Sequence, residues 1–265
     1  IDDNVTGDPT MQAMVDIYSA GIDANLLASP LGVGSASVLA SVNFDMEVGL
    51  YSESNLGNLC ADAFRVVATG AVIQSAEATP ISVAVVPNGV IRDPLRAGNV
   101  NMLTFSDLYN VLPLGISPAD QSALGYPLIT VYVTAPELRT IAEVAITGAS
   151  MANSNDLFLN VAGMRYTVDA NGPVMAKVRS VSLCGNTVPT AYGGDNDLFS
   201  SECDTVLVDL DNSNPGDPDM LYRIAVDYYT AIAMYKASVL GFDIVPKHPD
   251  GTPVDLTDTM EILSR

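Results

Sequence analysis

One turn carries the residue types best suited to binding an anion. Residues 81–86 are an apolar run typical of a buried strand, and Asn88, Gly89 and Arg92 follow directly. Ligands commonly bind at the carboxyl end of such a strand in α/β architectures. The planar Arg92 guanidinium matches a phosphate or carboxylate, Asn88 supplies an amide donor, and Gly89 lets the backbone turn. The alternative is that Arg92 pairs with Asp93 or with another of the 31 acidic residues.

The net charge narrows the range of partners. The 265 residues include 11 Lys and Arg against 31 Asp and Glu, so the formal charge is 11 − 31 = −20 with the single His neutral. A chain this acidic is not expected to bind nucleic acid, and anionic membranes would repel it. Hydrophobic residues make up 48%, which excludes a disordered chain and favours a large core. No stretch reaches the ~20 consecutive apolar residues of a membrane helix, so we predict no membrane span.

Motifs for catalysis are missing: the sequence has no Gly-x-Ser-x-Gly, no His-Glu-x-x-His and no glycine-rich loop with a phosphate-binding lysine. His248 lies in a turn of Pro, Asp and Gly, where we predict a surface position. With one His and no Cys-x-x-Cys, the chain is poorly suited to a zinc site. The acidic residues allow paired-carboxylate chemistry, but the sequence singles out no pair. We therefore predict no catalytic residue and no metal ligand in this chain.

Two polar features leave alternatives open. The acidic segments 195–197 and 209–219 offer oxygen donors for Ca²⁺ but lack a twelve-residue loop with a terminal Glu, so a solvated loop is the alternative. Cys184 and Cys203 enclose a polar loop that a disulfide would close, with about 3 kcal/mol of stabilisation, and two free thiols are the alternative. Cys60 lies in an apolar-periodic segment and is predicted to be a small core residue.

Helical and strand patterns alternate along the chain. Several predicted strands follow one another without a helix between them, which favours an α+β fold, a mixed β-sheet with flanking helices, over a doubly wound parallel sheet. Residues 1–50 are predicted to be a lead-in helix and strand in an interdomain linker region, and residues 51–265 a single domain. The predicted helices are 9–25, 55–69, 104–112, 135–145 and 228–240, and the predicted strands are 36–44, 81–86, 128–134, 158–162, 164–168, 174–183, 222–226 and 241–245.

Five blocks in the same order resemble the 5′-nucleotidase C-terminal domain family. Residues 54–65, read as SNLGNLCADAFR, resemble its E-S-N-L-G-N-L-x-x-D-A opening, and residues 86–92 resemble its N-G-G-G-I-R turn after a strand. Residues 98–115 resemble a stretch that ends in P-F-G. The segments FLNVAGMRY, 158–166, and YRIAV, 222–226, resemble two of its strands. Together these blocks span roughly residues 50–240 and imply the fold of that domain.

The resemblance also implies an activity for a longer protein, a periplasmic or cell-surface phosphohydrolase similar to bacterial UDP-sugar hydrolase and 5′-nucleotidase. In that family a separate N-terminal metallophosphatase domain holds two divalent metal ions, which activate a water and stabilise the leaving oxygen. The C-terminal domain binds the nucleotide, and domain rotation delivers it to the metals. This chain begins at Ile1 and resembles only the C-terminal half.

What this chain would do follows from that resemblance. We expect it to bind a nucleotide or another phosphate-ester small molecule, and to have as its partner an N-terminal metallophosphatase domain of the same gene product. We expect no cofactor in the chain itself, no hydrolysis by the isolated chain, and a periplasmic or extracellular location.

The resemblance assigns site residues by position. Asn88 and Arg92, with Gly89 between them, match the phosphate-side contacts. Leu114 stands where the family has its first base-stacking Phe, and Tyr229 matches the second stacking position.

Three further positions depart from the family pattern. An arginine ahead of the S-N-L-G-N block is replaced by Leu50 or a neighbour, residues 232–235 replace a G-G-D-G segment, and the N-G-G-G-I-R turn is one glycine shorter. These departures support the alternative hypothesis of a degenerate domain, which keeps the fold as a binding or structural module without nucleotide recognition.

Overall fold

The computed structural model describes residues 6–24, 32–75, 79–98, 101–113, 115–118, 125–185, 202–211, 217–239 and 242–263. The chain forms two compact units, each built from two stretches of sequence. Unit 1 comprises residues 1–47 and 91–125, and unit 2 comprises residues 48–90 and 126–265. The domain boundary expected at residue 50 stays a prediction.

Unit 1 holds two helices and a small antiparallel sheet among its described residues. The first helix, α1, begins at a proline, and the Asp8 carboxylate accepts hydrogen bonds from the Thr10 and Met11 amides at 2.9 and 3.1 Å. A capping box between Thr104 and Asp107 starts α3. The elements of unit 1 are α1 Pro9–Ile22, β1 Val38–Ser41, β3 Met102–Thr104 and α3 Phe105–Val111, with β1 paired to β3.

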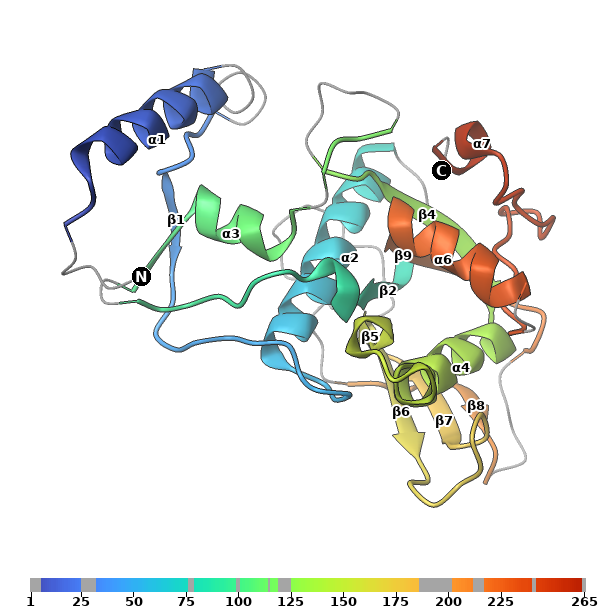
Figure 1. Cartoon of the computed structure of the whole chain (residues 1–265). Helices are drawn as coiled ribbons and strands as arrows, with labels where there is room; N and C mark the ends of the chain where they lie inside the picture. Colours follow the sequence, from blue (N-terminus) through green and yellow to red (C-terminus); the bar gives the residue numbers. More distant parts are fainter. Residues whose placement is uncertain are drawn as a thin grey trace. The chain divides into compact units, whose positions relative to one another are not determined.

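Unit 2 is centred on a mixed sheet with the strand order β4-β9-β2-β5 (Figure 1). The neighbours β2 and β9 run parallel, while β4 pairs antiparallel with β9 and β5 antiparallel with β2. All seven residues of β2 are buried, as expected for a strand covered on both faces. The predicted α+β class is therefore confirmed. The strands are β2 Ile81–Pro87, β4 Leu128–Thr134, β5 Leu159–Ala162 and β9 Leu221–Asp227.

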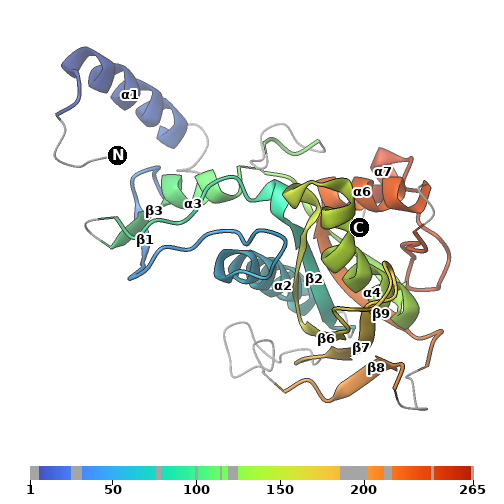
Figure 2. The same cartoon turned by 60° about the horizontal axis from the view of Figure 1, so that its bottom comes forward.

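Helices cover both faces of this sheet. The long helix α2, Asn55–Ser75, packs against β2 and β5, while α4, Ala135–Glu143, and α6, Tyr228–Val239, pack on the opposite face (Figure 2). Alternation along β2 explains this arrangement, since Val83 and Val85 join the core cluster with α4 and α6. The helix predicted over 55–69 continues to residue 75, and its inward face differs from the predicted stripe. Leu59 and Val67 are exposed, whereas Arg65 is buried.

A second sheet, in the order β6-β7-β8, continues the chain from β5. The buried carboxylate of Glu143 fixes the start of the middle strand, β7. It accepts hydrogen bonds from the Lys177 and Val178 amides at 3.1 and 2.7 Å and from Arg139 at 3.3 Å. The strand β8 was not predicted, because it lies between polar and acidic segments. The elements are η3 Val144–Gly148 (a π-helix), α5 Ala149–Ala152, η4 Asn155–Leu157, β6 Met164–Val168, β7 Val178–Leu183 and β8 Thr205–Asp209.

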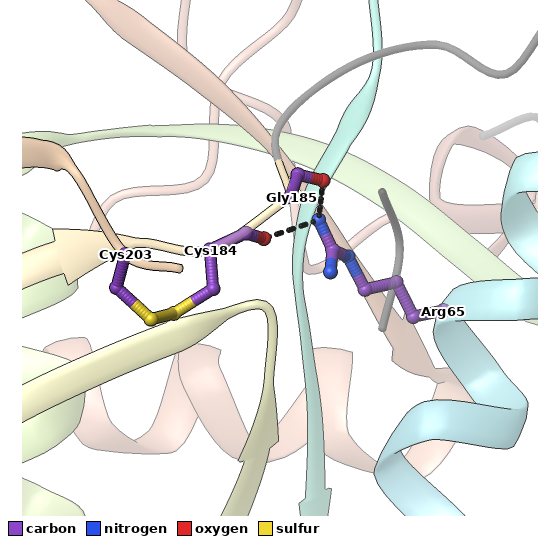
Figure 3. Close-up of a disulfide and its surroundings, with 4 residues drawn as sticks. All are labelled: Arg65, Cys184, Gly185 and Cys203. Carbon is purple, nitrogen blue, oxygen red and sulfur yellow. Dashed lines mark hydrogen bonds between the residues drawn. A yellow bond between two sulfur atoms is a disulfide. The ribbon is translucent and has the colours of Figure 1, made fainter. Parts of the chain in front are cut away.

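One buried guanidinium joins the two sheets. Arg65 is 1% exposed; its Nε donates to the Ile81 carbonyl at 3.0 Å, and its Nη2 donates to the Cys184 and Gly185 carbonyls at 3.1 and 2.7 Å (Figure 3). Burial lowers the pKa of Arg65 to about 10, and the nearby Asp62 carboxylate opposes that shift. Next to it, Cys184 and Cys203 form a disulfide, which decides between the two alternatives left by the sequence.

The third cysteine lies in the core as predicted. Cys60 is buried and unbridged, and burial raises the pKa of its thiol to about 12, so it is a poor nucleophile. The helix that carries it, α2, is long and apolar enough to cross a membrane by length and composition. However, 56% of the apolar window 55–74 is buried inside the protein, which is typical of a core helix.

The C-terminal segment departs from the sequence predictions. Residues 242–245 are not a strand, although the sequence predicted one over 241–245, and a short helix, α7 Thr259–Leu263, follows. Lys247 holds the segment in two ways: its backbone pairs with Tyr132 of β4 through hydrogen bonds of 2.9 and 2.8 Å, and its Nζ forms an ion pair with Glu137 at 2.5 Å. His248, predicted to be a surface residue, is half-buried, and its Nε2 lies 2.9 Å from the Glu261 carboxylate.

The bend between β5 and β6 generates a stability prediction. Gly163 has φ +78°, and a Cβ there would lie 2.2 Å from the Ser82 carbonyl oxygen and 2.5 Å from the Arg65 guanidinium carbon. We expect Gly163→Ala to lower the free energy of unfolding by about 3 kcal/mol or more, from backbone strain and overpacking together. Urea denaturation measures the loss.

A matched control separates strain from close packing. Gly251 also has a positive φ, +86°, but its nearest neighbour to an added Cβ lies 3.9 Å away. Gly251→Ala should therefore cost only the strain, about 1 kcal/mol. Equal losses for the two variants would contradict the packing argument.

Candidate functional site

The carboxyl ends of β2 and β9 form one edge of the sheet in unit 2. These neighbouring strands are parallel, with Ala84 paired to Ala225, so both end on the same side. The turn η2, Asn88–Val90, follows β2, and α6 follows β9 with Tyr228 and Tyr229 at its start. We call this region the carboxyl edge; in α/β sheets it is the usual place for ligands.

The Asn88 amide is fully engaged inside unit 2. The side chain is 3% exposed; its Nδ2 donates to the Gly49 carbonyl at 3.2 Å, and its Oδ1 accepts from Asn160 Nδ2 at 2.8 Å. The Asn88 backbone amide donates to the Phe158 carbonyl at 2.8 Å. These bonds fix the turn after β2. A ligand contact from the Asn88 side chain would require breaking one of them, and its role in binding stays a prediction.

Close backbone packing accounts for the glycine of this turn. A Cβ on Gly89 would lie 3.0 Å from the Asp156 Cβ and 3.1 Å from the Asp156 carbonyl oxygen. These distances are tighter than ordinary contacts, so a side chain here would push the turn away from η4. Gly89 therefore sets the path of the chain at the carboxyl edge.

Tyrosines gather on the other half of the carboxyl edge. Tyr229 is 52% exposed, and Tyr228 meets Tyr126 edge-on with ring centroids 5.9 Å apart. Asp227 holds the start of α6 by accepting hydrogen bonds from the Thr230 amide at 2.7 Å and its hydroxyl at 3.0 Å. Burial raises the pKa of Asp227, and the Thr230 bonds oppose that shift.

The pair Tyr126 and Tyr228 was not predicted as part of the site. Tyr126 lies just before β4, whose first residue, Leu128, pairs with Asp227 at the end of β9. The Tyr228-Tyr229 doublet at a strand-to-helix junction was the available signal. The partner ring is about a hundred residues away in sequence, so only the strand pairing reveals it.

Arg92 belongs to unit 1, whereas Asn88, Gly89 and Tyr229 belong to unit 2. The Arg92 amide donates to the Val111 carbonyl at 2.8 Å, and its side chain is exposed. Among the described residues its guanidinium has no ion pair or hydrogen bond, so the pairing with Asp93 that the sequence left open is not formed. Leu114, the remaining predicted site residue, lies outside the described residues.

Metal-binding groups do not gather in the described ranges: no three His, Cys, Asp or Glu side chains there come together as a metal site would need. Of the acidic segments considered for Ca²⁺, residues 195–197 lie outside the described residues. In the described part, Asp211 forms an ion pair with Arg179. The expectation that this chain carries no metal of its own stays a prediction.

The mixed sheet and the helix layers on its two faces define an α+β domain. The chain belongs to the 5′-nucleotidase C-terminal domain family, whose model matches residues 32–237. This match confirms the family expected from the five sequence blocks. No curated protein sequence matches the chain.

Solved structures support the same fold. A 5′-nucleotidase precursor from Thermus thermophilus is similar with a TM-score of 0.51 and 20% identity, over 84% of this chain and 34% of that one. The NAD nucleotidase of Haemophilus influenzae gives a TM-score of 0.48 and 16% identity, over 89% of this chain and 35% of that one. This chain therefore spans about a third of the length of the structures it resembles.

The Asn88 network predicts a structural role that can be measured. Asn88→Ala would remove one hydrogen bond from the buried Asn160 amide and one from the Gly49 carbonyl, which keep the Val86 carbonyl and the Asn155 amide as partners. For the loss of these two bonds we expect the free energy of unfolding to fall by about 1–3 kcal/mol. Asn171→Ala, in an exposed turn of the same unit, is the control and should change it by less than about 0.5 kcal/mol. An unchanged urea midpoint in Asn88→Ala would contradict the structural role of Asn88.

Proposed function

We propose that this chain is the substrate-recognition domain of a 5′-nucleotidase-type phosphohydrolase, and that it binds a nucleotide or a related phosphate ester through Arg92. The family supports the general class, and the state of the Arg92 side chain supports the specific role. Because the chain spans about a third of the similar structures, the activity of a whole hydrolase is part of this proposal.

Within the described part of the chain the Arg92 guanidinium has no partner, and this observation carries the proposal. The other arginines of the described ranges are engaged, for example Arg65 with carbonyls and Arg96 with Asp45 at 3.0 Å and Glu47 at 2.5 Å. Arg139, Arg179 and Arg223 also have side-chain partners, and Arg165 is not free either. In a chain with a charge of −20, an exposed arginine without an acidic partner is available for a phosphate, which its planar fork can bind with two parallel bonds.

The tyrosines of the carboxyl edge support recognition of a planar base. Tyr229 occupies the position of a stacking ring in the family, and its ring is half exposed. Stacking on an aromatic side chain contributes about 1–3 kcal/mol per base and tolerates different bases. We propose that Tyr229 contacts the base of the nucleotide.

Hydrolysis would take place on another part of a longer polypeptide. We propose that two divalent metal ions on a separate metallophosphatase domain supply the hydroxide nucleophile and stabilise the leaving oxygen. The residues described here supply no donor set for such ions, so the role of this chain is to bind and orient the substrate.

An oxidising compartment is part of the proposal. The Cys184–Cys203 disulfide supports export, because structural disulfides persist outside the reducing cytosol. We propose a periplasmic or extracellular location.

The Arg92 proposal is tested by calorimetric titration with AMP, inorganic phosphate and adenosine. Losing a charge-assisted contact costs about 1.5–3 kcal/mol, so we expect Arg92→Ala to weaken AMP binding roughly 10- to 100-fold. Adenosine binding should not change. Arg96→Ala is the matched control, because Arg96 is also an exposed arginine of unit 1 but is already paired with two acids.

The result also separates the two hypotheses about the domain. Absence of AMP binding by the unmodified chain would favour the degenerate module, which Leu50 and the altered residues 232–235 support. Equal effects of Arg92→Ala and Arg96→Ala would show that binding depends on net charge and not on this guanidinium.

The stacking proposal predicts a different pattern across the same ligands. Tyr229→Ala should weaken AMP and adenosine alike, by about 5- to 100-fold, and leave inorganic phosphate unaffected. Tyr18→Ala, which removes an exposed ring from α1, is the control. With no Trp in the sequence, tyrosine fluorescence provides a second readout of base binding. A Tyr229→Ala variant that binds AMP with unchanged affinity would contradict the stacking role.

A further inference from the structure

A cavity of about 530 Å³ lies in unit 2, away from the carboxyl-edge tyrosines. Its walls are the start of α2, the continuous stretch from Phe158 through β5 and β6, and the Cys184–Cys203 disulfide. The volume falls within the ~300–1,000 Å³ range of pockets that hold small organic ligands. Neither the family's site positions nor the proposed function uses these residues.

Carboxylates give the cavity its charge. Glu53, which lies just before α2, and Asp62 on α2 line it, together with Asn58, whose Nδ2 donates to Glu53 Oε1 at 2.7 Å. Asn58 and Asp62 are four residues apart, so they lie on one face of the helix. Burial raises the pKa of Asp62, which shows that this carboxylate is partly withdrawn from water.

The two arginines near the cavity already have partners. Arg65 lies behind Gly163 and donates to three backbone carbonyls. Arg165 is among the lining residues, but it is not free of partners either. A ligand that enters meets two carboxylates, Glu53 and Asp62, and one lining cation, Arg165, which already has a partner.

Apart from Asn160 and Arg165, the rest of the wall is mostly aromatic and aliphatic. Phe158, Val161, Met164 and Tyr166 line it, beside the sulfur atoms of the disulfide. Tyr166 and Glu53 both line the cavity, and burial and then the Glu53 charge raise the pKa of the Tyr166 phenol. A cation held between a carboxylate and an aromatic face gains both an ion pair and a cation–π contact.

We propose that this cavity binds an organic cation, a primary ammonium or guanidinium group carried on an apolar or aromatic body. Glu53 and Asp62 receive the charged group, Tyr166 contacts it through its ring, and the apolar wall contacts the body of the ligand. A bare metal ion would leave most of the cavity and its apolar wall unused.

Three probes of similar shape and different charge test this proposal by calorimetric titration of the full chain. Phenethylamine should bind at least tenfold more tightly than the neutral 2-phenylethanol, and phenylacetate should not bind measurably. Glu53→Gln should weaken phenethylamine at least fivefold, and so should Tyr166→Leu, whereas Tyr166→Phe keeps the ring and should keep the affinity. Glu53 is exposed, so its variant is expected to fold normally.

The control is Asp243→Asn, which removes an exposed acid that does not line the cavity. This variant should bind phenethylamine as the unmodified chain does. Equal affinity for the amine and the alcohol would overturn the proposal. It would also be overturned if Asp243→Asn weakened the amine as much as Glu53→Gln, since that would indicate diffuse attraction to an acidic protein.

The test does not depend on nucleotide binding. AMP at saturating concentration should leave phenethylamine affinity unchanged, because the carboxyl-edge residues are not part of this cavity. Competition between the two ligands would place them in one site and overturn the proposal.

Discussion

The architecture of unit 2 depends on a buried positive charge that backbone carbonyls hold, with the partly buried Asp62 carboxylate nearby. The Arg65 guanidinium is almost inaccessible to water, and it is held by backbone carbonyls of Ile81 and of the two residues that follow β7. Desolvating a guanidinium is costly, so those carbonyls must stay aimed at it. Gly163 is required at the same place, because only a residue without a Cβ fits between Arg65 and the Ser82 carbonyl. The two sheets are thereby fixed to each other and to α2.

Much of this fold could be predicted from apolar periodicity, but the orientation of α2 could not. The pattern located α2, β2, β4 and β9 because buried strands and amphipathic helices repeat at fixed spacing. It placed Leu59 and Val67 inward, whereas the helix turns Arg65 inward instead. Hydrophobic spacing cannot predict that three carbonyls, one from β2 and two from residues 184 and 185, surround the Arg65 guanidinium. Hydrophobic spacing also failed to predict β8, because the acidic residues that flank this strand are typical of a solvated loop.

The turn after β2 was predictable from the sequence, but the hydrogen-bond partners of its side chains were not. An asparagine and an arginine after a buried strand correctly indicated a polar turn at a sheet end. Sequence spacing could not show that Asn160, 72 residues further on, would engage the Asn88 amide from a neighbouring strand. It also could not pair Tyr126 with Tyr228, because that contact depends on the antiparallel register of β4 and β9. Local sequence predicts elements, whereas the partners of a side chain depend on tertiary pairing.

Asn88 is buried and Arg92 is exposed, and this difference has a physical cause. An amide can be buried cheaply when both its donor and its acceptor are satisfied, as they are for Asn88. A guanidinium has five donors and a permanent charge, so burying it requires several oxygen acceptors in fixed positions, as around Arg65. No such set surrounds Arg92 among the described residues, and its side chain stays in water. Asn88 therefore shapes the turn, whereas the Arg92 guanidinium has hydrogen-bonding capacity that no described residue uses.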